Sequence, residues 1–252
     1  MQLADSVVLI TGASSGIGRS VASALAGAGA QILVTGRDEA ALRRTAGDCR
    51  GVPLVAELSS PAGCAELAAR ALAVHGRIDV LVSSAGLGAA GPFERLSPES
   101  IVELIQVNLM APVLLARALL PGMLERERGH LVLIGSIAGL TGVADEAVYA
   151  ASKAGLSIFA ESLRLESHGR GVGVSTVVPG VVATAFFDRR GVPYGRRRPR
   201  PVPPERIARA IVHSIEHDRA ETIVPRWLGL APKVRALSPN RYRALARRFG
   251  NN

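Results

Sequence analysis

Residues 7–18 read VVLITGASSGIG, and this stretch decides the fold. Residues 7–10 form a continuous apolar run, which is typical of a strand buried on both faces of a parallel sheet. The glycine-rich turn leads into a segment whose apolar residues recur at helical spacing. Glycines permit close approach of a ligand, and the first turn of a helix offers free N–H groups to an anion. We interpret the stretch as a dinucleotide phosphate site, with a plain strand-to-helix turn as the alternative.

Strand-like and helix-like segments alternate along the rest of the chain. We expect helices over 60–74, from Ser97, from Tyr149 towards Leu165 and over 204–217. Further strands are expected at 31–35, 52–56, 78–82, 131–134, 172–178 and 221–224. This alternation implies right-handed crossovers between parallel strands. We therefore predict one α/β domain over residues 1–252, a Rossmann fold whose doubly wound parallel sheet has about seven strands and helices on both faces.

Glycines and small polar residues gather where these strands end. In doubly wound sheets the ligand lies beyond the carboxyl ends of the strands. The segments that fall there are residues 12–18, Arg37, residues 84–86, Ser136 and residues 179–184. Their convergence on one edge of the sheet predicts a single ligand site.

The second strand ends in Gly36-Arg37-Asp38. Dinucleotide folds often place an acid at the end of this strand, where it binds the ribose 2′-hydroxyl of NAD. Gly36 leaves that place empty, and the guanidinium of Arg37 suits a 2′-phosphate. We therefore expect NADP rather than NAD. The alternative is that Arg37 is solvated and Asp38 only caps the next helix.

Tyr149 and Lys153 lie four residues apart in the sequence YAASK, so in a helix they share one face. An ammonium beside a phenol lowers the phenol pKa from about 10, which suits acid–base catalysis. Lys153 and Lys233 are the two lysines among 30 Lys+Arg. Because Arg does not replace a compact ammonium, this use of Lys favours a specific role. A chance match to this short pattern is the alternative.

Asn108 lies in an otherwise apolar segment of the helix expected from Ser97. A buried amide needs hydrogen-bond partners. A structural hydrogen bond and a place in a proton relay both fit, and both stay open.

Together these motifs resemble the classical short-chain dehydrogenases/reductases. The residues that carry the resemblance are 11–18, Asp79, Ala85, Gly86, Asn108, Ser136, Tyr149, Lys153, Pro179, Gly180 and Thr184. The resemblance implies a Rossmann fold, a nicotinamide cofactor and hydride transfer to or from a carbonyl or alcohol carbon. Ser83-Ser84 and Glu57 depart from the family, which usually has Asn-Asn and Asp at these places.

The resemblance also implies roles for individual residues. Tyr149 would donate the proton in reduction, Lys153 would lower its pKa and bind the nicotinamide ribose, and Ser136 would hold the substrate oxygen. Asn108 would support a water relay. The implied cofactor-binding residues are Gly12, Ser14, Ser15, Gly16, Ile17, Gly18, Arg37, Glu57, Leu58, Ser84, Ala85, Gly86, Tyr149, Lys153, Pro179, Gly180, Val182 and Thr184.

Residues 185–204 are expected to form a lid over the substrate, with a solvated, flexible loop as the alternative. Phe186, Phe187 and Tyr194 would give it apolar walls, which favours a ketone or aldehyde reductase with an apolar substrate. The arginines at 196–198 favour instead an acidic or carrier-bound substrate, as for a 3-oxoacyl-type reductase. A protein that binds NADP as a sensor or scaffold, with little turnover, is the other alternative.

Charge is unevenly distributed along the chain. Residues 189–252 hold 16 Lys+Arg and 4 Asp+Glu, a net charge of +12, whereas residues 1–188 hold 14 and 17, a net charge of −3. We expect the basic C-terminal extension, residues 225–252, to pack on its own domain or a subunit partner. Weak contact with an anionic membrane is the alternative. No recognition motif for nucleic acid accompanies the charge, so no nucleic-acid partner is expected.

The remaining expectations concern the setting of the protein. The five histidines show no metal-ligand spacing, and the two cysteines indicate no disulfide framework. We expect a cytoplasmic protein, with peripheral membrane contact as the variant. The resemblance implies a homodimer or homotetramer built on the helices that carry Asn108 and Tyr149.

Overall fold

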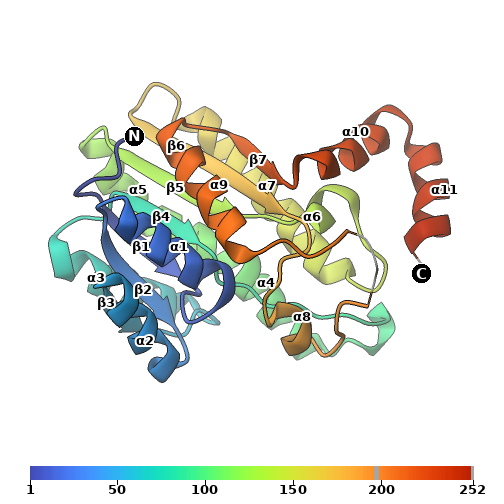
Figure 1. Ribbon diagram of the computed structural model, residues 1–252, viewed down its shortest axis with the longest axis horizontal. Helices are drawn as coiled ribbons and strands as arrows, with labels where there is room; N and C mark the ends of the chain where they lie inside the picture. The colour runs from blue at the N-terminus through green and yellow to red at the C-terminus, as the bar shows by residue number, and fades with distance from the viewer. Residues whose placement is uncertain (196–198, 251–252) are drawn as a thin grey trace.

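The computed structural model describes residues 1–195 and 199–250, with side chains as far as Ala246 in the last helix. One seven-stranded parallel sheet of order β3-β2-β1-β4-β5-β6-β7 runs through it (Figure 1). The strands are β1 (Val7–Thr11), β2 (Gln31–Gly36), β3 (Val52–Val55), β4 (Val80–Ser83), β5 (Gly129–Ile134), β6 (Val172–Pro179) and β7 (Glu221–Val224). The predicted fold class is confirmed. The strand order reverses between β1 and β4, which opens a crevice at their carboxyl ends.

Helices cover both faces of the sheet. They are α1 (Gly16–Gly27), α2 (Glu39–Cys49), α3 (Pro61–His75), α4 (Pro98–Ile105), α5 (Ala111–Glu125), α6 (Ile137–Thr141), α7 (Ala147–Glu166), α8 (Phe186–Arg189), α9 (Pro204–Glu216), α10 (Leu230–Leu237) and α11 (Pro239–Gly250). Shorter turns are η1 (Phe93–Arg95), the π-helical η2 (Gln106–Met110) and η3 (Arg226–Gly229).

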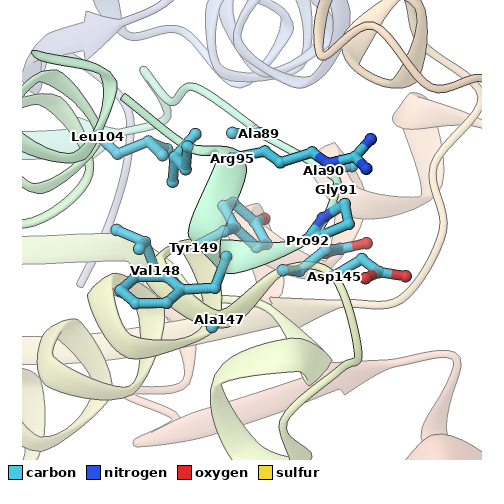
Figure 2. Close-up of a pocket in the computed structure, with 13 residues that line it drawn as sticks. Ala89, Ala90, Gly91, Pro92, Arg95, Leu104, Asp145, Ala147, Val148 and Tyr149 are labelled. Atoms are coloured by element: carbon cyan, nitrogen blue, oxygen red, sulfur yellow. The ribbon is translucent and has the colours of Figure 1, made fainter. Parts of the chain in front are cut away.

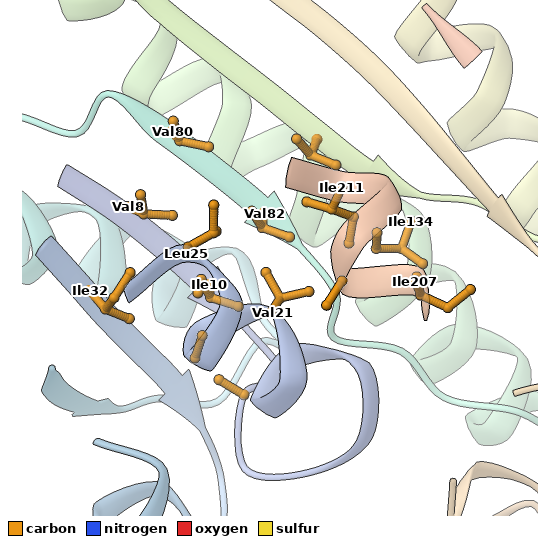
Figure 3. Packing of buried hydrophobic residues seen from close by; sticks show 14 of the residues in the cluster. Val8, Ile10, Val21, Leu25, Ile32, Val80, Val82, Ile134, Ile207 and Ile211 are labelled. Atoms are coloured by element: carbon orange, nitrogen blue, oxygen red, sulfur yellow. The ribbon is translucent and has the colours of Figure 1, made fainter. Parts of the chain in front are cut away.

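Alternation of side chains along the strands divides the core into two layers. Val8 and Ile10 of β1 point to the layer that holds α1 and α9, where they pack near Val21 and Leu25 (Figure 3). Val7 and Leu9 point to the opposite layer, which α3, α5 and α7 cover. Strands buried on both faces explain the continuous apolar runs in the sequence.

The helix expected from Ser97 is interrupted. Ser97 caps α4 by accepting a hydrogen bond from Ser100 N at 3.2 Å, but η2 separates α4 from α5. The combined segment Pro98–Glu125 is long and apolar enough to span a membrane. Its buried residues, among them Leu115 and Met123, belong to the core, so this segment is not evidence for a membrane span.

Asp79 connects three parts of the fold although it is almost wholly buried. Its Oδ2 accepts hydrogen bonds from Val7 N at 3.0 Å and from Arg77 Nε at 3.1 Å. Arg126 Nη2 lies 3.8 Å from Oδ1. The carboxylate therefore holds the starts of β1 and β4 together beside the end of α5.

We predict that Asp79→Ala lowers the free energy of unfolding by about 3 kcal/mol, because it leaves the buried Val7 N–H without its acceptor and two guanidinium groups without their counter-ion. Urea denaturation followed by circular dichroism measures the change. Asp48→Ala, which removes an exposed pair with Arg19, is the matched control and should cost at most about 1 kcal/mol. Equal losses in the two variants would contradict this role of Asp79.

Candidate active site

A cavity of about 1480 Å³ lies at the carboxyl ends of the strands. Of the predicted site residues, all but Gly18 and Asn108 line it. A hollow of about 70 Å³ adjoins it between residues 89–96 and the start of α7, with Tyr149 in the walls of both (Figure 2). The single ligand site predicted from the strand ends therefore corresponds to one continuous space.

The glycine-rich turn is packed too tightly for side chains. Gly12 has a φ of +67°, and a Cβ there would lie 2.7 Å from Ala85 Cα. A Cβ at Gly18 would lie 2.5 Å from Gly12 O, so Gly18 supports the turn from behind the cavity wall. Only glycine satisfies both positions without displacing backbone.

The N-terminus of α1 opens onto this turn. Its N-cap residue, Ser15, makes no capping hydrogen bond, and its Oγ accepts instead from Arg189 Nη1 at 3.2 Å. The first N–H groups of a helix have no intrahelical partner. The turn, the free N–H groups and the nearby guanidinium fit the diphosphate of a dinucleotide.

Lys153 reaches the end of β5 from within α7. Its Nζ donates to Ile134 O at 2.9 Å, and the residue is buried. A Cβ at Gly86 would lie 3.7 Å from this Nζ and 3.3 Å from Asn108 Oδ1. Lys153 and Asn108 therefore flank the backbone of Gly86, which lines the cavity.

Asn108 is fully buried in η2 and hydrogen-bonded through both ends of its amide. Its Oδ1 accepts from Leu87 N at 2.8 Å, and its Nδ2 donates to Leu87 O at 2.9 Å and to Ser152 Oγ at 3.3 Å. The structural hydrogen bond proposed from the sequence is thus present, although it holds the loop after β4 rather than a strand. π-Helical turns are frequent at functional sites.

Burial controls the titration of the central pair. It raises the pKa of Tyr149 to about 12, a hydrogen bond with Ser136 being the main opposing influence. It also lowers the pKa of Lys153 to about 8. The groups that act on the Tyr149 phenol are Ser136, Glu146 and Arg190 rather than Lys153, whose ammonium donates to Ile134 O, so the lowering of the phenol pKa by Lys153 stays a prediction.

Ser136 lies two residues beyond the end of β5 and caps the short helix α6. Its Oγ accepts from Ala138 N at 3.2 Å while its side chain also meets Tyr149. The cap fixes the hydroxyl at the cavity wall beside the phenol. Two hydroxyl groups therefore converge on one point of the cavity.

Arg37 lines the far end of the cavity with its side chain 59% exposed. Its Nη1 lies 3.8 Å from both Glu57 Oε2 and Glu103 Oε1, too far for hydrogen bonds. A Cβ at Gly36 would lie 3.2 Å from Ser14 Oγ, so an acidic side chain has little room there. Asp38 caps α2 through Ala41 N at 2.9 Å, as its alternative role required.

The two departures from the family pattern differ in their surroundings. Glu57 Oε1 accepts from Leu58 N at 2.9 Å and from Ser59 N at 3.1 Å, which closes the turn after β3. Ser84 N donates to Thr11 Oγ1, but the buried Ser83 Oγ has no hydrogen-bond partner within residues 1–195 and 199–250. The carboxylate of Glu57 therefore has hydrogen-bond partners in its turn, whereas the hydroxyl of Ser83 has none among the described residues.

Aromatic rings cover the catalytic end of the cavity. The centroid of Phe186 lies 5.7 Å from that of Tyr149, and Phe187 lies between Phe186 and Tyr194 at 5.6 and 5.2 Å. These are the three side chains expected to form apolar walls, and all three line the cavity. The arginines expected nearby, residues 196–198, lie outside the described residues.

Sequence reasoning missed an ion pair that joins the aromatic segment to α7. Arg190 pairs with Glu146, with side chains only 8% and 16% exposed, and its guanidinium lies 4.5 Å above the ring of Phe187. It also missed Arg189 at the glycine-rich turn. The local excess of Arg after Thr184 was a signal, but only the fold brings Glu146 and Ser15 within reach.

Within the described parts of the chain, no group of three or more His, Cys, Asp or Glu side chains could hold a metal ion. The polar groups of the cavity are instead hydroxyls, amides, an ammonium and arginines. They suit an organic anion and a carbonyl group.

Comparison with known proteins agrees with this geometry. The family model for short chain dehydrogenases matches residues 6–192. The chain belongs to this family. The resemblance stated from the motifs is therefore confirmed, and the protein is an NAD(P)-dependent oxidoreductase by family.

Relatives and solved structures extend over most of the chain. Ketoacyl reductase HetN of Nostoc sp. is 34% identical over 88% of this chain and 79% of its own length. 3-Oxoacyl-[acyl-carrier-protein] reductase FabG of Escherichia coli is 33% identical over 73% of this chain and 76% of its own.

A short-chain dehydrogenase from Sphingobium yanoikuyae in complex with NADPH is similar with a TM-score of 0.83 and 30% identity, covering 93% of this chain and 95% of its own. A family member from Burkholderia phymatum in complex with NAD has a TM-score of 0.87 and 25% identity, covering 95% of each chain. Both structures hold nicotinamide dinucleotides, which is the cofactor class of the family. One of these two neighbours is in complex with NADPH and the other with NAD.

We predict that Glu146→Gln loosens the segment that carries the aromatic rings, because it leaves Arg190 with an unpaired and nearly buried charge. Amide hydrogen exchange of residues 186–190 should be at least about tenfold faster, which corresponds to ~1.4 kcal/mol. Glu39→Gln removes the exposed pair with Arg43 and is the matched control. Unchanged exchange in Glu146→Gln would show that the ion pair does not hold the segment.

Proposed function

We propose that the protein is an NADPH-dependent reductase of an apolar ketone or aldehyde. The observation that carries the proposal is the arrangement around Tyr149. Its phenol meets Ser136 and stands beside Phe186, in a cavity whose other end has the glycine-rich turn and Arg37. A polar dinucleotide and an apolar carbonyl compound would occupy these two ends.

The side chains at the catalytic end supply binding and proton transfer. A bound nicotinamide dinucleotide supplies the hydride. The hydroxyls of Ser136 and Tyr149 would hold the carbonyl oxygen, and Tyr149 would donate its proton to that oxygen. A phenol whose pKa is raised to about 12 stays protonated at neutral pH, which makes it a ready donor and supports the direction of reduction.

The tyrosinate left after reduction must recover a proton. Lys153, whose pKa is lowered to about 8, loses a proton near neutral pH more easily than an ordinary lysine. Its Nζ and Asn108 Oδ1 both lie near Gly86, and Asn108 is fixed by Leu87 and Ser152. We therefore assign Lys153 and Asn108 to the return of the proton, with Lys153 also binding the nicotinamide ribose.

Three features around Arg37 support NADP as the preferred cofactor. Its guanidinium lies 3.8 Å from Glu57 and from Glu103 and donates a hydrogen bond to neither carboxylate, so its N–H groups are available to a phosphate. Gly36 provides no acid for the ribose 2′-hydroxyl, and Ser14 occupies the space where such an acid would begin. Glu57 and Glu103 keep Arg37 near the cavity wall. Arg37 and Ser14 would bind the 2′-phosphate.

A 3-oxoacyl substrate is the second candidate. Two relatives, HetN and FabG, bear the names of ketoacyl and 3-oxoacyl reductases. A β-keto thioester would present its keto oxygen to the same two hydroxyls. The lid segment, residues 185–204, would then cover the chain of the acyl group.

Assembly and location complete the proposal. Val102 on α4 and Ile158 and Leu165 on α7 are at least 67% exposed. These exposed apolar side chains lie on the two helices expected to form subunit contacts, and a homodimer or homotetramer would bury them. We place the enzyme in the cytoplasm, as the reducing cofactor and the two free cysteines suit.

We predict that Tyr149→Phe lowers kcat for carbonyl reduction at least about 100-fold, because general acid catalysis is worth about 10²- to 10⁴-fold. The NADPH dissociation constant should change less than about threefold, since the aromatic ring remains. NADPH oxidation and nicotinamide fluorescence give the two values. Tyr242→Phe, which removes a hydroxyl that does not line the cavity, is the control.

Retained activity in Tyr149→Phe would overturn the assignment of the proton donor. Tight NADPH binding without turnover of ketones, aldehydes or 3-oxoacyl thioesters by the unaltered protein would favour the sensor or scaffold alternative. Rates that are much higher for 3-oxoacyl thioesters than for simple ketones would select the second candidate.

We predict that the unaltered protein binds NADPH more tightly than NADH and that Arg37→Gln removes the difference. Loss of a charged contact to the 2′-phosphate should weaken NADPH binding about 10- to 100-fold. NADH binding should stay within about threefold. Titration with each nucleotide, followed by nicotinamide fluorescence, measures both, with Arg44→Gln as a control on the exposed side of α2. Equal affinities in the unaltered protein would overturn Arg37 as the selector.

A further inference from the structure

The C-terminal extension exposes a row of large apolar side chains. Trp227, Leu230, Val234 and Leu237 are between 37% and 88% exposed. Their spacing of three, four and three residues places them along one face of η3 and α10. We call these four side chains the apolar row. Such a contiguous row on a surface commonly marks a binding site.

Basic residues accompany the apolar row. Residues 225–252 contain seven Lys+Arg and no Asp or Glu. Arg226, Lys233, Arg241 and Arg243 are exposed, and none of them forms an ion pair with a residue that the structure describes. The extension therefore carries positive charge that nothing in this part of the domain neutralises.

Three contacts fix the extension so that the apolar row faces outward. Leu228 is buried and packs against Gly180, where a Cβ would lie 2.3 Å from its Cδ1. Arg235 Nη1 donates to Leu140 O at 2.8 Å, and Tyr242 OH donates to Thr141 O at 3.0 Å. Apart from these contacts, α10 and α11 project from the body of the domain (Figure 1).

We propose that the apolar row and its flanking basic residues dock on the surface of an anionic membrane. An amphipathic helix with Trp and Leu on one face and Lys and Arg on the other lies in the plane of a bilayer interface. The indole of Trp227 suits the headgroup region, and the basic side chains would contact anionic headgroups.

The charge argues for lipid rather than a second copy of the chain. Two extensions pairing through their apolar rows would bring together two segments of +7 with no acidic residue between them. An anionic headgroup layer instead offers many negative charges to one extension. Docking of the apolar row on a membrane would also leave the rest of the domain outside the bilayer. The contacts with α6 and with Gly180 hold the extension on the side away from its exposed apolar row.

The neighbouring cavity lies close to this surface. Residues 143–145 line the cavity and lie just after α6. Arg235 and Tyr242 donate hydrogen bonds to carbonyl groups at the end of the same helix. Leu228 lines the cavity as well, next to the exposed Trp227. Lipid binding itself requires no turnover, so it is independent of the proposed reductase activity.

Cosedimentation of the full chain with vesicles tests the proposal. The unaltered protein should sediment with vesicles of phosphatidylcholine and phosphatidylglycerol, bind phosphatidylcholine alone much more weakly, and be released by salt. Leu230→Ser/Leu237→Ser and Arg226→Gln/Lys233→Gln/Arg241→Gln should each weaken partitioning at least about tenfold.

Matched variants on the body of the domain control for apolar area and charge. Val55→Ser/Val74→Ser removes two exposed apolar side chains, and Arg44→Gln/Arg170→Gln/Arg209→Gln removes the same number of positive charges, three, from exposed sites outside the extension. Both should partition as the unaltered protein does. Equal loss in the control and extension variants would overturn the proposal.

Two other results would also overturn it. One is equal sedimentation of the unaltered protein with and without anionic vesicles. The other is a change of oligomeric state in Leu230→Ser/Leu237→Ser, measured by light scattering without lipid, since that would make a second copy the occupant. Circular dichroism of each variant establishes that it is folded.

Discussion

The close approach of the glycine-rich turn to the end of β4 is the constraint on which the site depends. Gly12 lies so near Ala85 that a Cβ would meet its backbone at 2.7 Å, and Thr11 Oγ1 accepts from the N–H groups of both Ser84 and Ala85. This contact joins the two strands where the sheet order reverses. It brings the free N–H groups of α1 and the backbone of Gly86 to one cavity. A side chain at Gly12 would separate them.

The catalytic end is built from buried polar groups that position one another. Asn108 ties the loop after β4 to Ser152 of α7, and Lys153 of the same helix reaches the end of β5. Because Ser152 and Lys153 are adjacent in α7, these separate hydrogen bonds fix three elements around Gly86. Burial moves the pKa of Tyr149 up and that of Lys153 down, so the pair consists of a protonated phenol and an easily deprotonated amine. Environment, rather than the mutual attraction of the two groups, sets their titration.

Arginine serves different purposes in different parts of the molecule. The side chain of Arg190 is buried, pairs with Glu146 and stacks on Phe187. These contacts hold the aromatic wall against α7. The guanidinium of Arg189 reaches the glycine-rich turn, and that of Arg37 stays exposed at the cavity rim. In the C-terminal extension arginine lies beside exposed apolar side chains with no acidic neighbour in the sequence. The positive net charge is therefore divided between the cavity and an outer surface.

Local pattern was sufficient for the sheet, its parallel order and the family, because buried strands, a glycine-rich turn and the YAASK segment each have a short-range signature. Residues 7–18, Asn108 and Lys153 were identified for this reason, and the boundaries of most strands lay within a few residues of those observed. The pKa of Tyr149 was not accessible in this way, because it depends on how much of the phenol the folded chain removes from water. The same holds for the Glu146–Arg190 pair, the contact of Arg189 with Ser15 and the outward direction of the apolar row. Each depends on segments far apart in the sequence meeting in space, which only the packing of the tertiary structure decides.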